Sequence, residues 1–378
     1  MADRQETSLR FLEGTIISRG LLGESVRIVT VVGARPQFIK AAPVSRAVRQ
    51  RHEEVLVHTG QHYDANLSDV FFDALDLPRP DYNLGVGSGS HAWQTGEMMK
   101  GLERVLDQEK PDFVLVYGDT NSTLAGALVA SKVPLPVGHV EAGLRAYNRV
   151  YPEEINRIIV DDVSVLLFCP TPTAVDNLRR EGITRGVHMV GDVMYDVALA
   201  NREAAKARDI GRRLNLRDGE YLLVTLHRPS NVEDRATLGR IVEALLRSGR
   251  EVVFPVHPRT RKSLRAFGLW DSLQAKATLI EPVDYLDFTA LLMSAAKVVT
   301  DSGGVQKEAY FFGVPCVTLR EETEWMETVS GGWNLLAGTK TEDILNALDR
   351  PRPSGETSNA FGDGRAAEKI AHLLDTFA

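Results

Sequence analysis

The sequence contains only two cysteines in 378 residues, and both stand far apart in apolar segments, at Cys169 and Cys316. This spacing favours buried thiols in a reducing compartment over a disulfide or a metal site. No apolar run is long enough to cross a bilayer, and residues 1–25 lack the apolar core and the cleavage site of a secretion signal. We therefore expect a cytoplasmic protein with no membrane partner, in which residues 1–25 are a flexible extension or result from an early start codon.

Excess positive charge is missing as well. The net charge is −7 at pH 7 and the isoelectric point is near 5.8, so the sequence offers no basic surface of the kind that binds nucleic acid. Short-period repeats, low-complexity tracts and metal-ligand spacings are also absent. The hydrophobic content of 43% and charged content of 25% are typical of a soluble globular protein. Because 378 residues exceed one ordinary core, we expect two domains.

Short apolar segments rich in β-branched residues recur along the chain and are separated by helical patterns. This alternation predicts parallel strands joined by helical crossovers, that is, the α/β class with two Rossmann-like domains facing each other across a cleft. The predicted domains are 26–195 and 196–363, a polar helix over 201–214 is the expected linker, and the last helix, 364–377, is a candidate to cross back onto the first domain. The predicted strands are 27–32, 54–58, 112–117, 136–140, 165–169, 187–190, 221–225, 251–256, 278–280, 297–300 and 314–319.

Polar residues follow several predicted strands of the first half, at the edge where open α/β sheets bind ligands. Several polar groups at one edge are harder to explain as solvated surface than any one alone. For Arg35 or Lys40 alone a surface cation remains the alternative, and for Glu153 and Glu154 it is a helix-capping carboxylate. The residues that share this edge are Arg35, His62, Asp119, Glu141 and Arg145.

A glycine-rich turn in the second half has the pattern of an anion site. Lys297–Thr300 reads as the end of a buried strand, Asp301–Gly304 as a turn, and Val305 as the start of a helix that carries Glu308 in its early turns. Backbone N–H groups at such a helix start suit a diphosphate, and an acidic residue one turn on suits ribose hydroxyls. The alternative is a strand–helix connection without a ligand.

Eight motifs, in order along the chain, make the sequence resemble the non-hydrolysing UDP-N-acetylglucosamine 2-epimerases, including the branch that acts on UDP-2,3-diacetamido-2,3-dideoxyglucuronic acid. The resemblance implies the GT-B architecture, with the nucleotide held mainly by the second domain, and a homodimer. It covers residues 26 to about 340. The motifs are Gly33-Ala-Arg-Pro-Gln-Phe-Ile-Lys40, Gly60-Gln-His62, Gly118-Asp-Thr-Asn-Ser122, His139-Val-Glu-Ala-Gly-Leu-Arg145, Pro152-Glu-Glu-Ile-Asn-Arg157, Thr225-Leu-His-Arg228, Val256-His257 and Thr300-Asp-Ser-Gly-Gly-Val-Gln306.

The resemblance also implies roles for individual residues. The catalytic residues it implies are Asp119, Glu141, Glu153 and His227. The substrate-binding residues are Arg35, Lys40 and His257, the uracil contacts Val283 and Phe288, the diphosphate loop Ser302, Gly303 and Gly304, and the ribose ligand Glu308. An allosteric site for a second UDP-sugar is partly matched by Gln61 and His62, with Asp64 in place of a usual glutamine.

The chemistry of the family accounts for these residue types. The hydrogen on carbon 2 of the sugar is not acidic until UDP leaves carbon 1, after which a carboxylate can remove it to give a glycal. Re-addition of a proton on the other face and return of UDP complete the inversion. This needs an acid and a base on opposite faces of the ring, and donors for the diphosphate. It needs no nicotinamide or metal cofactor.

The sequence departs from the family pattern at several positions. Trp325 stands where many members have a substrate-contacting arginine, Gln37 where a glutamate is common, and Pro229 where many have a second arginine. The tryptophan leaves open whether the sugar is N-acetylglucosamine or the diacetamido uronic acid, whose carboxylate would need a cation. A GT-B glycosyltransferase and a sensor without turnover are the alternatives of other classes. The candidate cations for a sugar carboxylate are Arg145, Arg149 and Arg228.

Overall fold

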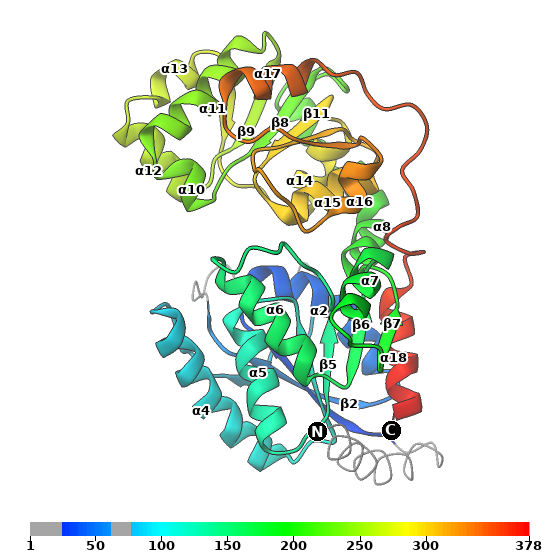
Figure 1. Ribbon diagram of the computed structural model, residues 1–378. Helices are drawn as coiled ribbons and strands as arrows, with labels where there is room; N and C mark the ends of the chain where they lie inside the picture. Colours follow the sequence, from blue (N-terminus) through cyan, green and yellow to red (C-terminus); the bar gives the residue numbers. More distant parts are fainter. Residues whose placement is uncertain (1–24, 62–76, 378) are drawn as a thin grey trace. The chain divides into compact units, whose positions relative to one another are not determined.

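The computed structural model describes residues 25–61 and 77–377, without the side chains of Arg35, Thr376 and Phe377. The chain forms two compact units, which are Met1–Val197 with Ala360–Ala378 and Ala198–Asn359 (Figure 1). Among the helices of the described ranges, none combines the length and the apolar composition needed to span a membrane.

The N-terminal unit contains a seven-stranded sheet in the order β3-β2-β1-β4-β5-β6-β7, in which every pair is parallel. Its central strands are buried along their whole length, as expected for a parallel sheet with helices on both faces. Helices α4, α5 and α6 pack side by side in chain order, and α18 packs beside α2 (Figure 1). The strands are β1 (Arg27–Val32), β2 (Glu53–His58), β3 (Tyr82–Asn83), β4 (Phe113–Tyr117), β5 (Val137–Val140), β6 (Leu166–Cys169) and β7 (Val187–Met189). The helices are α2 (Arg35–Val48), α4 (His91–Glu109), α5 (Asn121–Lys132), α6 (Pro152–Val163), α7 (Pro172–Arg180), α8 (Val193–Lys206) and α18 (Ala366–Phe377).

The C-terminal unit contains a six-stranded sheet in the order β10-β9-β8-β11-β12-β13, again parallel throughout. The strands are β8 (Tyr221–Thr225), β9 (Glu251–Pro255), β10 (Thr278–Ile280), β11 (Lys297–Thr300), β12 (Cys316–Thr318) and β13 (Asn334–Leu336). The helices are α9 (Ile210–Arg213), α10 (Pro229–Val232), α11 (Arg235–Arg247), α12 (Pro258–Ala266), α13 (Trp270–Gln274), α14 (Tyr285–Met293), α15 (Gly303–Phe311), α16 (Met326–Ser330) and α17 (Thr341–Asp349).

Both sheets have the doubly wound strand order. The first three strands in the chain are added toward one edge of the sheet, and the fourth strand pairs with the first on its other side, from where the remaining strands continue toward the opposite edge. In the N-terminal unit the reversal lies between β1 and β4, and in the C-terminal unit between β8 and β11. Ligands of this fold bind beyond the carboxyl ends of the strands at that point. The predicted α/β class with two Rossmann-like domains is confirmed.

Some local expectations are wrong. The polar linker helix over 201–214 is instead the second half of α8, which begins at Val193 and ends at Lys206, followed by the short α9. The first turns of α8 bury Val193, Met194 and Val197, so packing starts the helix before its polar part. The strands β3 and β13 were not predicted, and β3 has only two residues.

The end of α17 depends on one buried lysine. The Lys297 ammonium donates to the backbone carbonyls of Ala347 and Leu348 at 3.0 and 2.6 Å, and also to that of Arg350. We expect Lys297→Met to lower the free energy of unfolding of the C-terminal unit by about 2 kcal/mol, because the three carbonyls lose their buried donor. Calorimetry should show a Tm lowered by roughly 4–8 °C. Lys262→Met, at an exposed position of α12, is the control and should change the Tm little; an equal shift in both variants would contradict this role.

Candidate active site

Gln37 ties together the two loops at the strand reversal of the N-terminal unit. Its side-chain oxygen accepts from the N–H groups of Gly33 and Ala34 at 2.8 and 3.0 Å, just after β1. Its side-chain nitrogen donates to the Tyr117 carbonyl at 2.8 Å and the Thr123 hydroxyl at 3.0 Å, at the end of β4 and the start of α5. A carboxylate could accept but not donate, so the amide suits this position, where many relatives were expected to carry glutamate.

Glu141 follows β5 and forms an ion pair with Lys40 of α2, and both side chains are largely buried. Its backbone has φ 73°, the left-handed region that side chains rarely adopt. Strain of this kind persists where the surroundings hold it, and here the N–H of Glu141 donates to the Phe168 carbonyl at 3.1 Å. Lys40, a predicted substrate-binding residue, therefore contacts a candidate catalytic carboxylate in this structure. The side chain of Arg35 and all of His62 lie outside the described part.

Asp119 follows β4 and is held by α6. The Arg157 guanidinium pairs with its carboxylate, and the Asn156 amide donates to its carbonyl at 2.8 Å. Arg157 also donates to Glu154 at 2.8 Å, and Glu154 is fully buried, whereas Glu153 beside it is exposed. The structure thus separates the two carboxylates at the start of α6. Arg157 was missed as a site residue, although its spacing of three from Glu154 indicates a pair on one helical face.

A buried charged network lies behind these loops. Asp161 of α6 accepts from His139 Nδ1 and from Arg145 at 2.7 Å each, and His139 Nε2 lies 2.7 Å from the Gly118 carbonyl, directly before Asp119. Burial alone would raise the pKa of Asp161, but His139 and Arg145 hold it below its usual value. Both ring nitrogens of His139 therefore face oxygen acceptors, which fixes the ring under the β4 loop.

Arg145 is a wrong candidate for a sugar carboxylate. Besides Asp161 it pairs with Glu181 at 2.6 Å, and its side chain is only 1% exposed. Arg149 is exposed and Arg228 half-buried, so these two of the three cations remain candidates.

Gln61 is also committed to internal hydrogen bonds. Its side-chain oxygen accepts from the N–H and hydroxyl of Ser122 at 3.0 and 2.7 Å, at the start of α5, and the residue is buried. The Thr59 and Ser122 hydroxyls are 2.8 Å apart. The structure thus gives Gln61 a structural role next to the N-terminal loops, and its predicted allosteric role stays a prediction.

In the C-terminal unit the loops after β8 and β11 meet through His227 and Asp301. The Nδ1 atom of His227 lies 3.0 Å from the Asp301 carboxylate, and the ring of His227 is 6.0 Å from that of His257. His257 Nδ1 accepts from the N–H of Arg259 at 3.2 Å, so its Nε2 carries the proton in the neutral ring. Sequence reasoning placed Asp301 in the turn but gave it no partner.

The predicted diphosphate loop forms the start of α15, which begins at Gly303, two residues earlier than predicted. A Cβ atom at Gly303 would lie 2.8 Å from a carboxylate oxygen of Glu324 and 3.1 Å from the indole nitrogen of Trp325. The Lys307 ammonium lies 3.8 Å from the ring centroid of Trp325, and both residues are buried. Trp325 is thus a packed residue whose N–H edge reaches the glycine turn.

The other predicted nucleotide contacts lie around α14 and α15. Val283 and Phe288 are partly buried and pack against a buried core cluster that includes Leu291 and Ala309. Glu308 is buried in α15, one turn beyond the glycines.

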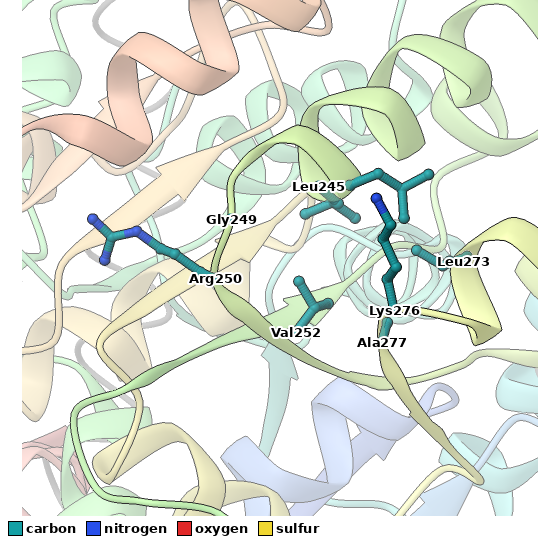
Figure 2. Close-up of a pocket in the computed structure, with 8 residues that line it drawn as sticks. Leu245, Gly249, Arg250, Val252, Leu273, Lys276 and Ala277 are labelled. Carbon is teal, nitrogen blue, oxygen red and sulfur yellow. The ribbon is translucent and has the colours of Figure 1, made fainter.

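A cavity of about 300 Å³ lies elsewhere in the C-terminal unit, between the end of α11 and the start of β9 (Figure 2). Leu245, Leu273 and Lys276 line it, while the side chain of Arg250 points away from them. Its lining residues lie at the amino ends of β9 and β10, whereas His227 and His257 follow the carboxyl ends of β8 and β9, so the cavity is not part of the candidate site.

The fold and these loops define an α/β protein of the GT-B class, with polar side chains and helix starts gathered where each sheet reverses its strand order. Residues 46–375 match the sequence profile of the UDP-N-acetylglucosamine 2-epimerase family, and the chain belongs to this family. The family prediction made from the motifs is thereby confirmed.

Three relatives show how far the similarity extends. The chain is 51% identical over 354 residues to a UDP-N-acetylglucosamine 2-epimerase homolog from Methanococcus maripaludis, covering 92% of this chain and 99% of the relative. It is 48% identical over 359 residues to the UDP-2,3-diacetamido-2,3-dideoxy-D-glucuronate 2-epimerase of Pseudomonas aeruginosa, with 92% and 99% covered. The crystal structure of Methanocaldococcus jannaschii UDP-GlcNAc 2-epimerase in complex with UDP-GlcNAc and UDP matches with a TM-score of 0.84 and 43% identity, over 93% of this chain and 99% of that chain.

Proposed function

We propose that this protein is an isomerase that interconverts UDP-GlcNAc and UDP-ManNAc. The observation that carries the proposal is the pair of carboxylates at the ends of neighbouring strands, since Asp119 follows β4 and Glu141 follows β5, and each faces its own cation. Relatives at 43% identity or more are named as epimerases of UDP-sugars, which supports a UDP-sugar substrate.

The reaction proceeds by elimination and re-addition. The bond between carbon 1 and UDP breaks and its electron pair leaves with UDP, while a carboxylate takes the proton from carbon 2 and a double bond forms between the two carbons. A proton returns to the opposite face of carbon 2 and UDP returns to carbon 1. Asp119, Glu141 and Glu153 are the proposed proton-transfer groups and His227 the catalytic histidine, because acid–base catalysis of this kind needs positioned carboxylates or histidine.

The remaining assignments complete the proposal. N–H groups at the start of α15 hold the diphosphate, because a helix start presents donors and a positive dipole end to an anion. The enzyme works in the cytoplasm as a homodimer. The proposed contacts are Ser302, Gly303 and Gly304 with the diphosphate, Glu308 with ribose, Val283 and Phe288 with uracil, Arg35, Lys40 and His257 with the substrate, and Gln61 and His62 with a second UDP-sugar.

The test is turnover in heavy water. Because a carboxylate exchanges its proton with solvent, purified protein and UDP-GlcNAc alone should give UDP-ManNAc with deuterium on carbon 2, as seen by proton NMR. Since no acceptor is supplied, this outcome also separates an epimerase from a glycosyltransferase. Epimerised product without deuterium would exclude the proton-loss route.

The sugar is tested in the same assay. Incubation with the UDP-linked diacetamido uronic acid is the matched comparison, since a relative at 48% identity carries that name. We expect efficient turnover of UDP-GlcNAc; efficient turnover of the uronic acid alone would overturn the proposed sugar and would point to Trp325 as the residue that changes the pocket.

A further inference from the structure

Asp301 stands at the end of β11 with its side chain fully buried. One carboxylate oxygen accepts from the N–H groups of His227 and Arg228 at 3.1 and 2.9 Å, and the Asn231 amide donates to it at 3.3 Å. The other oxygen also accepts from the N–H of His227, at 3.2 Å, and lies 3.0 Å from His227 Nδ1. The Asp301 carboxylate thus accepts from the backbone N–H groups of the loop after β8 and also contacts the imidazole ring of His227 in that loop.

The chemistry of these contacts determines the form of the His227 ring. Burial would raise the pKa of Asp301, but hydrogen bonds from His227 and from the backbone hold it below its usual value, so the group is a carboxylate that can only accept. In a neutral imidazole one ring nitrogen carries the proton, and contact with a carboxylate favours that proton on the nitrogen that faces it, which for His227 is Nδ1. The side chain is 45% exposed, so the rest of the ring is accessible.

Asp301 also links the histidine to the anion-binding turn. β8 and β11 are neighbours at the strand reversal, where Thr225 pairs with Thr300, and Asp301 is followed directly by Ser302 and Gly303 at the start of α15. The position of His227 is therefore set by the same residue that begins the glycine turn.

We propose that Asp301 is a positioning residue that fixes His227 in the Nδ1–H tautomer and presents its Nε2 atom to the substrate. This rests on the proposed function, in which His227 is the catalytic histidine. Among the described residues, the other charged or titratable groups around His227 are His257, whose ring is 6.0 Å away, Arg259, which donates to the His227 carbonyl at 3.4 Å, and the adjacent Arg228.

The test is Asp301→Asn. The amide oxygen of the new side chain can still accept from the backbone of the β8 loop, but its NH₂ group then faces His227 Nδ1 and forces the proton to Nε2. Loss of the correct tautomer in comparable dyads lowers kcat by up to about 10⁴-fold. We expect kcat to fall by about 10²–10⁴-fold, with KM for the UDP-sugar changed less than threefold.

The tautomer itself is read from two-bond ¹⁵N–¹H spectra of protein labelled at its nine histidines. His227→Gln identifies the His227 signal. We expect the Nδ1–H pattern in the wild type and the Nε2–H pattern in Asp301→Asn. Asp234→Asn is the control, because Asp234 accepts from the N–H of Thr237 at 2.7 Å at the exposed start of α11 in the same unit. It should leave both tautomer and kcat unchanged.

Two results would overturn the proposal. One is an Nε2–H tautomer of His227 in the wild type, which is decisive even if the variant does not fold. The other is a folded Asp301→Asn variant with kcat within threefold of the wild type. The spectrum is recorded on the resting protein without substrate, so an Nδ1–H tautomer in a protein without epimerase activity would reject the proposed function and leave the positioning of His227 intact.

Discussion

Glu141→Gln is expected to lower kcat for epimerisation by about 10²–10⁴-fold, the usual contribution of a general acid or base. The amide has nearly the shape of the carboxylate but cannot take up the carbon 2 proton. Exchange of solvent deuterium into carbon 2 should fall to the same extent, as measured by proton NMR. The affinity for UDP, measured by calorimetry, should change little, because the proposed nucleotide contacts belong to the C-terminal unit.

Glu97→Gln is the matched control for this variant. Glu97 belongs to α4 of the same unit and forms an ion pair with Lys100 at 2.8 Å, with 38% of its side chain exposed. We expect its kcat to stay within twofold of the wild type. If Glu141→Gln also retained wild-type kcat while folded, Glu141 would not take part in proton transfer.

Gly304→Val is expected to weaken UDP binding by roughly 100-fold, about 3 kcal/mol, because a branched side chain would occupy the space of the diphosphate and cover the donors at the start of α15. In the described structure a Cβ at Gly304 meets only the Ser302 hydroxyl, at 3.9 Å. A change in UDP affinity measured by calorimetry would therefore come from contact between the valine and the ligand, and not from rearrangement of neighbouring side chains. Gly303→Val is less informative, since its Cβ would lie 2.8 Å from Glu324.

Gly239→Val provides the control for Gly304→Val. Gly239 is a helical glycine of α11 in the same unit, and apart from its chain neighbours and the nearby backbone of α11 no atom of the described residues lies within 4 Å of a Cβ built there. Gly239→Val places the same β-branched residue in a helix as Gly304→Val does, but at a position away from the proposed diphosphate site. We therefore expect its UDP affinity to stay at the wild-type value. Unchanged affinity in a folded Gly304→Val protein would show that the turn does not hold the diphosphate.

The expectations that held depend on local patterns. Buried parallel strands read as short β-branched runs, so the strand ends at Tyr117, Val140 and Thr300 could be placed within a residue from the sequence. Because ligands of this fold meet the carboxyl ends of strands, Asp119 and Glu141 followed as candidates, and their catalytic roles stay predictions. The motifs then identified the family.

The sequence by itself determined the alternation of strands and helices, the edge of each sheet where polar residues gather, and the family. Only the tertiary structure decided which polar side chains are used internally: Arg145 and Gln61 share that edge with Glu141, but Arg145 pairs with Asp161 and Glu181 and Gln61 accepts from Ser122. The residue type alone does not show whether a polar side chain bonds within the protein or contacts a ligand, because a buried ion pair and a ligand contact need the same chemical groups. The links between Asp119 and Arg157, 38 positions apart, and between His227 and Asp301, 74 apart, arise only when the fold brings distant strand ends and helix starts together.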